Sequence, residues 1–312
     1  MTSSLRTKIA QRANALTLAR SFFSQRGLIE VDCLILSSKA AIDVNIDLFT
    51  VSSPIHGQKF LFSSPECPMK RLLSQGSGDI FYLGHVFRHE DAGYRHSPEF
   101  LLAEWYRIGI SFQQMMEETV EFAELFIGSR RHCFLSYRQA FLTYAKIDPY
   151  TASFPELVHA CQHFEGYPVE QSSVDDLLNL LLALKVEPCF DPTCITVLYH
   201  YPSSQAALAR QTDEDGHRVA ERFEIYCGGL ELANGYHELA DATEQRARLI
   251  ADNAERERLG KEAYPIDENF LASLGRGLPD CCGVAVGVDR LLMIQQAATS
   301  IADVMPISWE MA

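Results

Sequence analysis

The 312-residue chain lacks a long apolar run, which excludes both a signal-peptide core and a membrane span. Its first residues instead place Arg6, Lys8, Arg12 and Arg20 among apolar ones. There is also no low-complexity tract, no internal repeat and no linker rich in proline, glycine and serine that would mark a boundary. The sequence therefore predicts one continuous domain over 1–312 in a cytoplasmic protein.

Basic residues are scarce. The chain has 27 lysines and arginines against 41 aspartates and glutamates, for a formal net charge of −14. No basic run relieves this excess, so a large footprint on a nucleic-acid backbone is disfavoured. We expect the partner to be a small molecule or a basic protein surface.

The nine cysteines include no CxxC pair, and their odd number together with the adjacent Cys281 and Cys282 does not suit a disulfide framework. Cys189, Cys194 and His200 lack the spacing of a four-ligand zinc site. The sequence therefore predicts ordinary thiols in a reducing compartment.

Glycine-rich phosphate motifs are missing as well: the chain has no Walker loop, no GxGxxG fingerprint and no nucleophile elbow. An enzyme of this sequence that handles phosphates must therefore use arginines, carboxylates and metal.

Apolar periodicity predicts interleaved strands and helices without a βαβ repeat, which is typical of an α+β fold with a largely antiparallel sheet. A first helix should end near Arg26 before Gly27, and Ser64-Pro65-Glu66 should start another. Strands are expected over 28–36, 79–90 and 99–110, helices over most of 111–190 and over 243–261, a hairpin over 222–239, a helix capped by Asp267, and a strand passing into a helix over 283–297.

Charged and aromatic groups are crowded into "FRHEDAGYRHSPEF" (87–100). In a strand, Arg88 and Glu90 would share a face. An arginine suits bidentate contact with phosphate, and a nearby glutamate can accept a hydrogen bond from an amino group.

Glu104 is surrounded by the apolar residues of "FLLAEWY" (100–106). Burying an unpaired carboxylate costs several kcal/mol or forces it to bind a proton. Alternation places Phe100, Glu104 and Tyr106 on one face and the nearest cation, Arg107, on the other. Either a ligand ammonium supplies the missing charge, or the acid lies at an edge and reaches water.

The Gly228-Gly229 pair predicts a two-residue hairpin turn in which 227 faces 230, 226 faces 231 and 224 faces 233. One face would carry apolar residues, and the other would bring Glu224 diagonally across from Glu231. Two converging carboxylates suit a hard cation such as magnesium, whereas a solvated outer face is the alternative.

Several of these stretches resemble the signature motifs of class II aminoacyl-tRNA synthetases. "RGLIEVDCLIL" (26–36) is similar to motif 1, "FRHE" (87–90) with "HSPEF" (96–100) to motif 2, and "GVAVGVDRL" (283–291) to motif 3. "SSPECPMKRLL", "HSPEFLLAEWY", "YHYPSSQAALA" and "RVAERFEIYCGGLELANGYHELAD" resemble the lysyl branch, and within it the short paralogues that attach lysine or β-lysine to elongation factor P. The resemblance covers the whole chain.

This resemblance implies a class II catalytic domain over 1–312, a mostly antiparallel sheet flanked by helices, without an anticodon-binding domain. It implies an ATP-dependent, AMP-forming ligase that uses Mg²⁺ and forms a homodimer. Its partners would be lysine or (R)-β-lysine and elongation factor P, with neither tRNA nor a membrane involved.

The resemblance also assigns roles to individual residues. Arg88 would hold the α-phosphate and the substrate carboxylate, and Arg290 would reach the γ-phosphate. Glu90 would accept from the adenine amino group and Phe100 would stack on adenine. The other implied nucleotide contacts are Ser97, Glu231, Leu232 and Gly287, and the implied magnesium ligands are Glu224 and Glu231.

For the amino acid, the resemblance implies that Glu66 takes the amine at the reactive end. Glu104, Tyr106 and Glu238 would recognise the distal ammonium. Ser64, Pro65 and Ala285 complete the implied substrate site.

The chain departs from the family pattern at three positions. Leu34 replaces a proline of motif 1, which builds the dimer interface, and Ser97 replaces the usual asparagine of motif 2. Ala285 stands where lysyl-tRNA synthetases have glycine and the elongation-factor-modifying relatives have alanine. One methyl group is worth about 1–3 kcal/mol of discrimination, so we expect β-lysine to be preferred over α-lysine.

Two alternatives stay open. A truncated lysyl-tRNA synthetase could still charge tRNA, although the acidity of the chain disfavours it. A synthetase-like binding or regulatory protein without catalysis would usually lose its phosphate arginines and metal acids, which are present here as Arg88, Arg290, Glu224 and Glu231.

Overall fold

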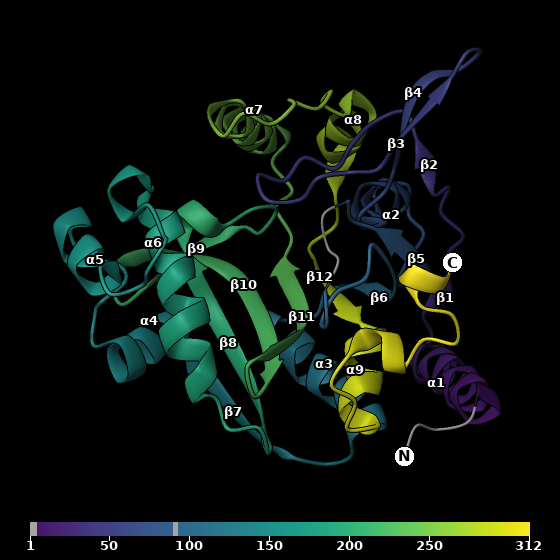
Figure 1. Ribbon diagram of the computed structural model, residues 1–312. Helices are drawn as coiled ribbons and strands as arrows, with labels where there is room; N and C mark the ends of the chain where they lie inside the picture. Colours follow the sequence, from purple (N-terminus) through teal and green to yellow (C-terminus); the bar gives the residue numbers. More distant parts are fainter. Residues whose placement is uncertain (1–4, 90–92) are drawn as a thin grey trace. The chain divides into compact units, whose positions relative to one another are not determined.

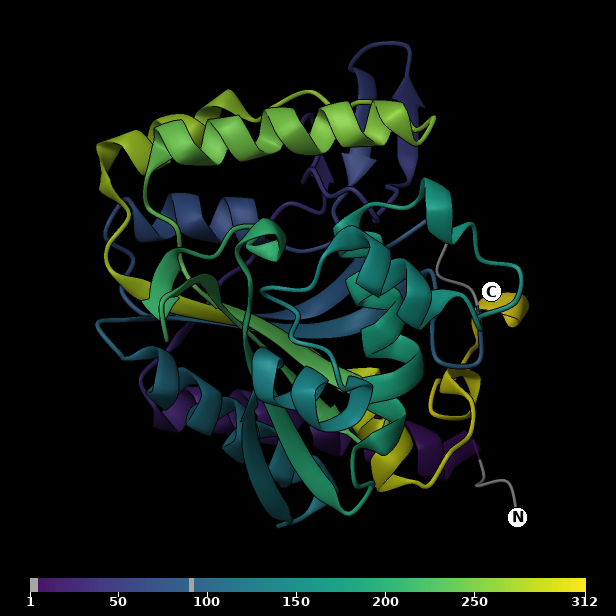
Figure 2. The same ribbon diagram turned by 90° about the vertical axis from the view of Figure 1, so that its left-hand side faces the viewer.

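The computed structural model describes residues 5–89 and 93–312. The chain divides into two compact units: unit 1 comprises residues 1–128 and 238–312, and unit 2 comprises 129–237. Each unit combines a mostly antiparallel sheet with helices (Figures 1 and 2), so the predicted α+β class is confirmed. The single domain expected over 1–312 stays a prediction.

The main sheet of unit 1 has the strand order β1-β5-β6-β12. Its strands are β1 (Ile29–Glu30), β5 (Ile80–Phe87), β6 (Glu99–Ile108) and β12 (Cys281–Gly287). β1 runs parallel to β5, whereas β5 with β6 and β6 with β12 are antiparallel. The predicted pair of long strands on either side of Gly93 is thereby confirmed.

Helices cover both faces of this sheet, and Figures 1 and 2 show α2 on the face opposite α1 and α3. On the α1 side the core is aromatic: the Phe23 ring stacks on Phe81 with centroids 4.4 Å apart, and Trp105 and Phe122 lie beside it. The α-helices of unit 1 are α1 (Leu5–Gln25), α2 (Glu66–Leu73), α3 (Phe112–Ile127), α7 (Ala242–Arg258), α8 (Glu268–Gly277) and α9 (Val288–Gln295).

Local signals placed most of these helices correctly. α1 ends beside Gly27, whose φ of 76° favours glycine. Asp267 caps α8 by accepting from the backbone N–H groups of Asn269 and Phe270. β12 passes directly into α9, as expected.

The single strand predicted over 28–36 is wrong. Only its ends are strands, β1 and β2 (Leu36–Ser37), and they belong to different sheets. β2 pairs with β4 (Gly57–Leu61), which also pairs with β3 (Thr50–Ser53). The chain crosses between the two sheets at residues 31–35, so the backbone there has no continuous partner strand, and Leu34 is 86% exposed.

The sheet of unit 2 has the order β11-β10-β8-β7, with β9 paired to β10. Its strands are β7 (Arg131–Ser136), β8 (Cys194–Pro202), β9 (Gln211–Glu214), β10 (His217–Cys227) and β11 (Leu230–His237). Its α-helices are α4 (Tyr137–Ala140), α5 (Phe154–Cys161) and α6 (Val174–Leu181), and π-helical segments at Phe141–Ala145 and Leu182–Val186 extend α4 and α6. The helical prediction for 111–190 missed β7, a short strand whose pairing with β8 is parallel and non-local.

The predicted hairpin is present as β10–β11, with Cys227 opposite Leu230 and Tyr226 opposite Glu231. The predicted pairing of 224 with 233 is wrong, because Glu224 faces Asn234. A register shift between Ile225 and Tyr226 gives β11 one extra residue, which is the signature of a β-bulge.

Among the described residues, no helix combines the length and the apolar character that crossing a membrane requires.

Candidate active site

The residues implied for the site fall in both units. Unit 1 holds Ser64, Pro65, Glu66, Arg88, Ser97, Phe100, Glu104, Tyr106, Glu238, Ala285, Gly287 and Arg290, and unit 2 holds Glu224, Glu231 and Leu232. Glu90 lies outside the described residues.

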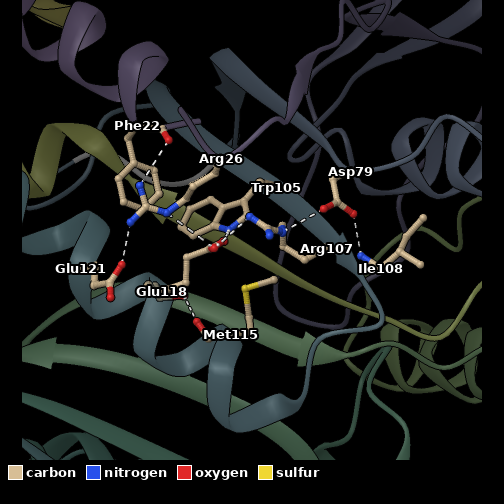
Figure 3. A network of polar contacts seen from close by, with 10 residues as sticks. Phe22, Arg26, Asp79, Trp105, Arg107, Ile108, Met115, Glu118 and Glu121 are labelled. Atoms are coloured by element: carbon tan, nitrogen blue, oxygen red, sulfur yellow. Dashed lines mark hydrogen bonds and ion pairs between the residues drawn. The ribbon is translucent and has the colours of Figure 1, made fainter. Parts of the chain in front are cut away.

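Glu104 is buried at 2% exposure in a central strand of the unit 1 sheet, which excludes the alternative of an edge position. Strand alternation separates it from Arg107 as predicted. Figure 3 shows the other face of β6, where Arg107 pairs with Asp79 and Glu118 at 3.0 Å each. Among the described residues, no cation makes an ion pair with Glu104.

Glu104 does receive two hydrogen bonds. The Ser64 hydroxyl donates to Oε2 at 2.7 Å, and the Tyr106 hydroxyl donates to Oε1 at 2.9 Å. Ser64 Oγ also accepts from the backbone N–H of Glu66, which links the start of α2 to the carboxylate. Burial, reinforced by the charge of Glu66, raises the pKa of Glu104 to about 8.

Lys70, one turn further along α2, is fully buried. Its Nζ lies 2.6 Å from Oε1 of Glu66 and 2.5 Å from Oε2 of Glu238, so it bridges two acids from distant parts of the sequence. Burial alone would lower the pKa of Lys70, but the charges of Glu238 and Glu66 outweigh this and raise it, so the ammonium stays charged.

Glu238 stands at the junction after β11 and is 5% exposed. Its Oε1 is buried and has no hydrogen-bond partner among the described residues. Burial and the charges of Glu66 and Glu104 raise the pKa of Glu238, although Lys70 opposes them. An acceptor oxygen without a donor in a buried position indicates a missing partner.

Gly283 closes one side of this group. A Cβ atom built on Gly283 would lie 2.3 Å from Cε1 of Tyr106 and 2.5 Å from Oε1 of Glu238, so a side chain here would displace them. Two residues later, Ala285 pairs in register with Glu104 across β12 and β6. We call Ser64, Glu66, Lys70, Glu104, Tyr106 and Glu238 the acid cluster.

The acid cluster contains three carboxylates and a single resident cation. Such a buried excess of acceptors suits a ligand that brings ammonium groups, because a charge in a dry site needs a partner. The structure thus brings together Ser64, Glu66, Glu104, Tyr106 and Glu238, as expected.

A second group lies at the Phe100 end of the same sheet. The guanidinium carbon of Arg88 is 5.2 Å from the centroid of the Phe100 ring, so cation and aromatic face are neighbours. The Ser97 hydroxyl is buried and has no hydrogen-bond partner among the described residues. A guanidinium group suits a phosphate, an aromatic ring suits a base, and a buried hydroxyl can form a hydrogen bond with either. Together these three groups suit a nucleotide.

Arg290 lies in the first turn of α9, and its Nη2 is 2.6 Å from Nε2 of His96. The preceding residue, Asp289, is buried, accepts from the backbone N–H of Leu101 at 2.7 Å and pairs with Arg12. Gly287 pairs with Leu102. These contacts place Arg290 at the same end of the sheet as Phe100.

In unit 2, Glu224 is buried at 6% exposure, which excludes the solvated outer face. Its Oε1 accepts from Arg222 at 2.6 Å, and its Oε2 accepts from the hydroxyls of Tyr201 at 2.5 Å and of Tyr226. A carboxylate offers about four acceptor positions, so about one remains for a metal ion. Glu231 faces Tyr226 across the hairpin and is half-buried.

Glu224 and Glu231 therefore fit magnesium in donor type, with Glu224 restricted to a single contact. Leu232, implied for the nucleotide, is buried beside the bulge.

Sequence reasoning missed three contributors. Lys70 gave no signal beyond an ordinary i,i+4 spacing from Glu66, which usually marks a surface pair. Gly283 was visible only as one glycine of a motif. Asp289 looked like a charge in the first turn of a helix.

Comparison with known proteins gives a consistent result. Residues 1–308 match the family model of class II tRNA synthetases (D, K and N). A protein of Avibacterium paragallinarum named elongation factor P--(R)-beta-lysine ligase is 44% identical, with 100% of this chain and 98% of the relative covered. Proteins of the same name from Pasteurella multocida (strain Pm70) and Salmonella typhi are 42% and 41% identical, covering 96% and 97% of this chain and 94% and 95% of the relatives.

Proposed function

Because the chain belongs to the class II aminoacyl-tRNA synthetase family, and its relatives of the same length are β-lysine ligases, we propose that it is an ATP-dependent ligase that activates (R)-β-lysine or lysine and transfers it to a lysine side chain of elongation factor P. The resemblance predicted from the sequence is confirmed at 41–44% identity over nearly the full length. The family model spans both units, which supports a single catalytic domain over 1–312.

One observation carries the choice of substrate. The acid cluster has two buried carboxylates, Glu104 and Glu238, and the half-buried carboxylate of Glu66 around one lysine ammonium, and Oε1 of Glu238 is left without a donor among the described residues. A diammonium amino acid supplies the charges and donors that this arrangement lacks. We assign Glu66 to the amine near the reactive end, and Glu104, Tyr106 and Glu238 to the distal ammonium, with Ser64 and Pro65 beside them.

The nucleotide would lie at the Phe100 end. Phe100 is assigned to stack on adenine, Ser97 to donate to the nucleotide, and Glu90 to accept from the adenine amino group. Arg88 would hold the α-phosphate and the substrate carboxylate, and Arg290 the γ-phosphate. Gly287, Glu231 and Leu232 are the remaining proposed nucleotide contacts.

Two displacements make up the reaction. A carboxylate oxygen of the amino acid attacks the α-phosphorus of ATP, the bond to the bridging oxygen breaks, and pyrophosphate leaves with the electron pair. The neutral amine of the acceptor lysine then attacks the acyl carbon of the adenylate, AMP leaves, and the amine loses its proton to solvent.

Arg88 and Arg290 would contribute by position and charge rather than by a covalent bond. Magnesium, when bound at Glu224 and Glu231, supplies charge neutralisation for the phosphates. Neither displacement requires a nucleophilic side chain of the protein.

Ala285 supports a preference for β-lysine over α-lysine, because it pairs with Glu104 and its methyl group shapes the wall beside that acid. ATP–pyrophosphate exchange should then show a higher kcat/KM for (R)-β-lysine than for α-lysine. Equal values for the two substrates would contradict this preference.

We also infer that the protein is a homodimer located in the cytoplasm.

The test is a mass measurement. The protein is incubated with ATP, Mg²⁺ and α- or (R)-β-lysine, with either elongation factor P or tRNA as acceptor. We expect elongation factor P to gain one acyl group and tRNA to stay unmodified. Charging of tRNA alone would favour the truncated synthetase, and the absence of any adenylate would favour a non-catalytic protein.

A further inference from the structure

Lys70 is a buried cation to which neither the family motifs nor the proposed reaction gives a role. It lies on α2 and is fully buried. Its Nζ bridges Glu66 at 2.6 Å and Glu238 at 2.5 Å. A lysine is almost never buried to this degree without a reason, because taking an ammonium group out of water is expensive.

The charge balance of the acid cluster explains why Lys70 is buried there. Glu66, Glu104 and Glu238 supply three acids, and Lys70 is the one cation bonded to any of them among the described residues. The other ionisable neighbours among the described residues include the hydroxyls of Tyr82 and Tyr106 and the thiols of Cys33, Cys67 and Cys281, all kept neutral because burial raises their pKa values. Asp267, which interacts with Cys67, accepts from the backbone N–H groups at the start of α8. When a bound diammonium ligand keeps all three acids ionised, two of them remain to be balanced beside charged Lys70, which equals the number of ammonium groups in lysine or β-lysine.

Geometry adds a second function. Glu66 comes from α2 and Glu238 from the segment after β11, so nothing in the sequence holds them together. Lys70 contacts Oε1 of Glu66 and Oε2 of Glu238, so Oε1 of Glu238 is not bonded to Lys70. That oxygen lies 2.5 Å from where a Cβ atom on Gly283 would be. Without Lys70, the buried Glu238 and the half-buried Glu66 would repel each other and bind protons instead of ligand ammonium groups.

We propose that Lys70 is the positioning residue of the amino-acid site: a resident counter-ion that balances one of the three acids and holds Glu66 and Glu238 ionised and oriented for a diammonium substrate. This inference rests on the proposed function, which supplies the substrate. Lys70 would influence substrate binding by holding Glu66 and Glu238 in place, without contacting the reacting atoms itself.

The experiment uses chemical rescue in ATP–pyrophosphate exchange. Lys70→Ala removes three carbons and the ammonium group, and 1-propylammonium replaces those same atoms. We expect Lys70→Ala to raise the KM for the amino acid at least tenfold while the KM for ATP stays within twofold. Added 1-propylammonium should lower the KM of Lys70→Ala for the amino acid at least fivefold. The neutral 1-propanol, which is equal in size, should leave this KM unchanged.

Arg71→Ala is the matched control, since Arg71 is the next cation on the same helix and is only half-buried. It should leave both KM values unchanged. Lys70→Met, which keeps the volume without the charge, covers the case in which Lys70→Ala does not fold, as judged by its thermal unfolding. Lys70→Met should show the same rise in the KM for the amino acid.

An unchanged KM in a folded Lys70 variant, or equal rescue by 1-propanol, overturns the inference. Failure of the proposed function looks different: the wild-type protein itself would then show no exchange that depends on the amino acid.

Discussion

At the scale of single residues, Glu104 offers the most direct test of the amino-acid site. Glu104→Gln keeps the shape but removes the charge that an ammonium group needs. Hydrogen bonds to charged groups contribute about 1.5–3 kcal/mol, so we expect the KM for the amino acid to rise about 10- to 100-fold. The KM for ATP should change little, and steady-state exchange kinetics measure both.

Glu118→Gln provides the control, because Glu118 lies on α3 and contacts the opposite face of β6. Glu118 accepts from Trp105 at 2.8 Å and from Arg107 at 3.0 Å (Figure 3), so its loss should lower stability without changing either KM. An equal rise in the amino-acid KM for both variants would show that Glu104 acts through stability alone.

Glu104 should also leave a mark on the stability of the ligand-free protein. Its pKa is about 8 in the folded state, against an ordinary value of 4.5. Between these values the folded state holds a proton that the unfolded state has lost, so the free energy of unfolding should fall as pH rises from about 4.5 to about 8. Urea unfolding from pH 5 to 9 measures this slope, and Glu104→Gln should make it shallower. A slope unaffected by the substitution would contradict the assigned protonation.

The burial of Glu104 could be predicted from the sequence, whereas the burial of Lys70 could not. An acid inside a continuous apolar strand is anomalous by itself, because strand alternation alone fixes its face and its burial. Lys70 sits four residues after Glu66 on a helix, a spacing found on countless exposed surfaces. Only the tertiary position of Glu238, which comes from another part of the chain, turns that pair into a buried bridge.

At the scale of secondary-structure elements, β12 is held against β6 by a glycine. Gly283→Ala would bring Cβ to 2.3 Å from the Tyr106 ring and 2.5 Å from Glu238, and an overpacked interior typically loses about 1–3 kcal/mol. We expect lower stability in chemical denaturation and a raised KM for the amino acid.

Gly275→Ala is the matched control in the same unit. Gly275 lies within α8, and a Cβ there meets nothing within 4 Å. Helix propensity should therefore stabilise this variant by about 0.5–1 kcal/mol and leave catalysis intact. If Gly283→Ala were also stabilised and fully active, the close contact of β12 with Tyr106 and Glu238 would not limit the side chain at position 283.

Elements with local signals were predictable and those that depend on distant partners were not. Capping and periodicity located α1, α8 and the β12–α9 junction, because those signals lie within a few residues. The run 28–36 looked like one strand, but β1 needs β5 and β2 needs β4, and no local pattern reveals two partners. The bulge in β11, which no local pattern revealed, changed the partner of Glu224 from residue 233 to Asn234.

At the scale of the whole molecule, the predicted homodimer can be tested at motif 1. Leu34 is 86% exposed, and Ile35 and Leu36 beside it are exposed as well. If this segment lies in an interface, Leu34→Glu should convert the protein from dimer to monomer in sedimentation-velocity experiments. Ile55→Glu, at a residue 85% exposed between β3 and β4, should leave the dimer intact. A wild-type monomer would refute the prediction outright.

The pairing of Arg12 with Asp289 has a practical consequence for handling the protein. Asp289 anchors the backbone of Leu101 and immediately precedes Arg290, so the first helix is tied to the residues that should grip the triphosphate tail. Trimming the chain within α1, or fusing a bulky affinity tag there, should therefore impair ATP usage more than lysine usage.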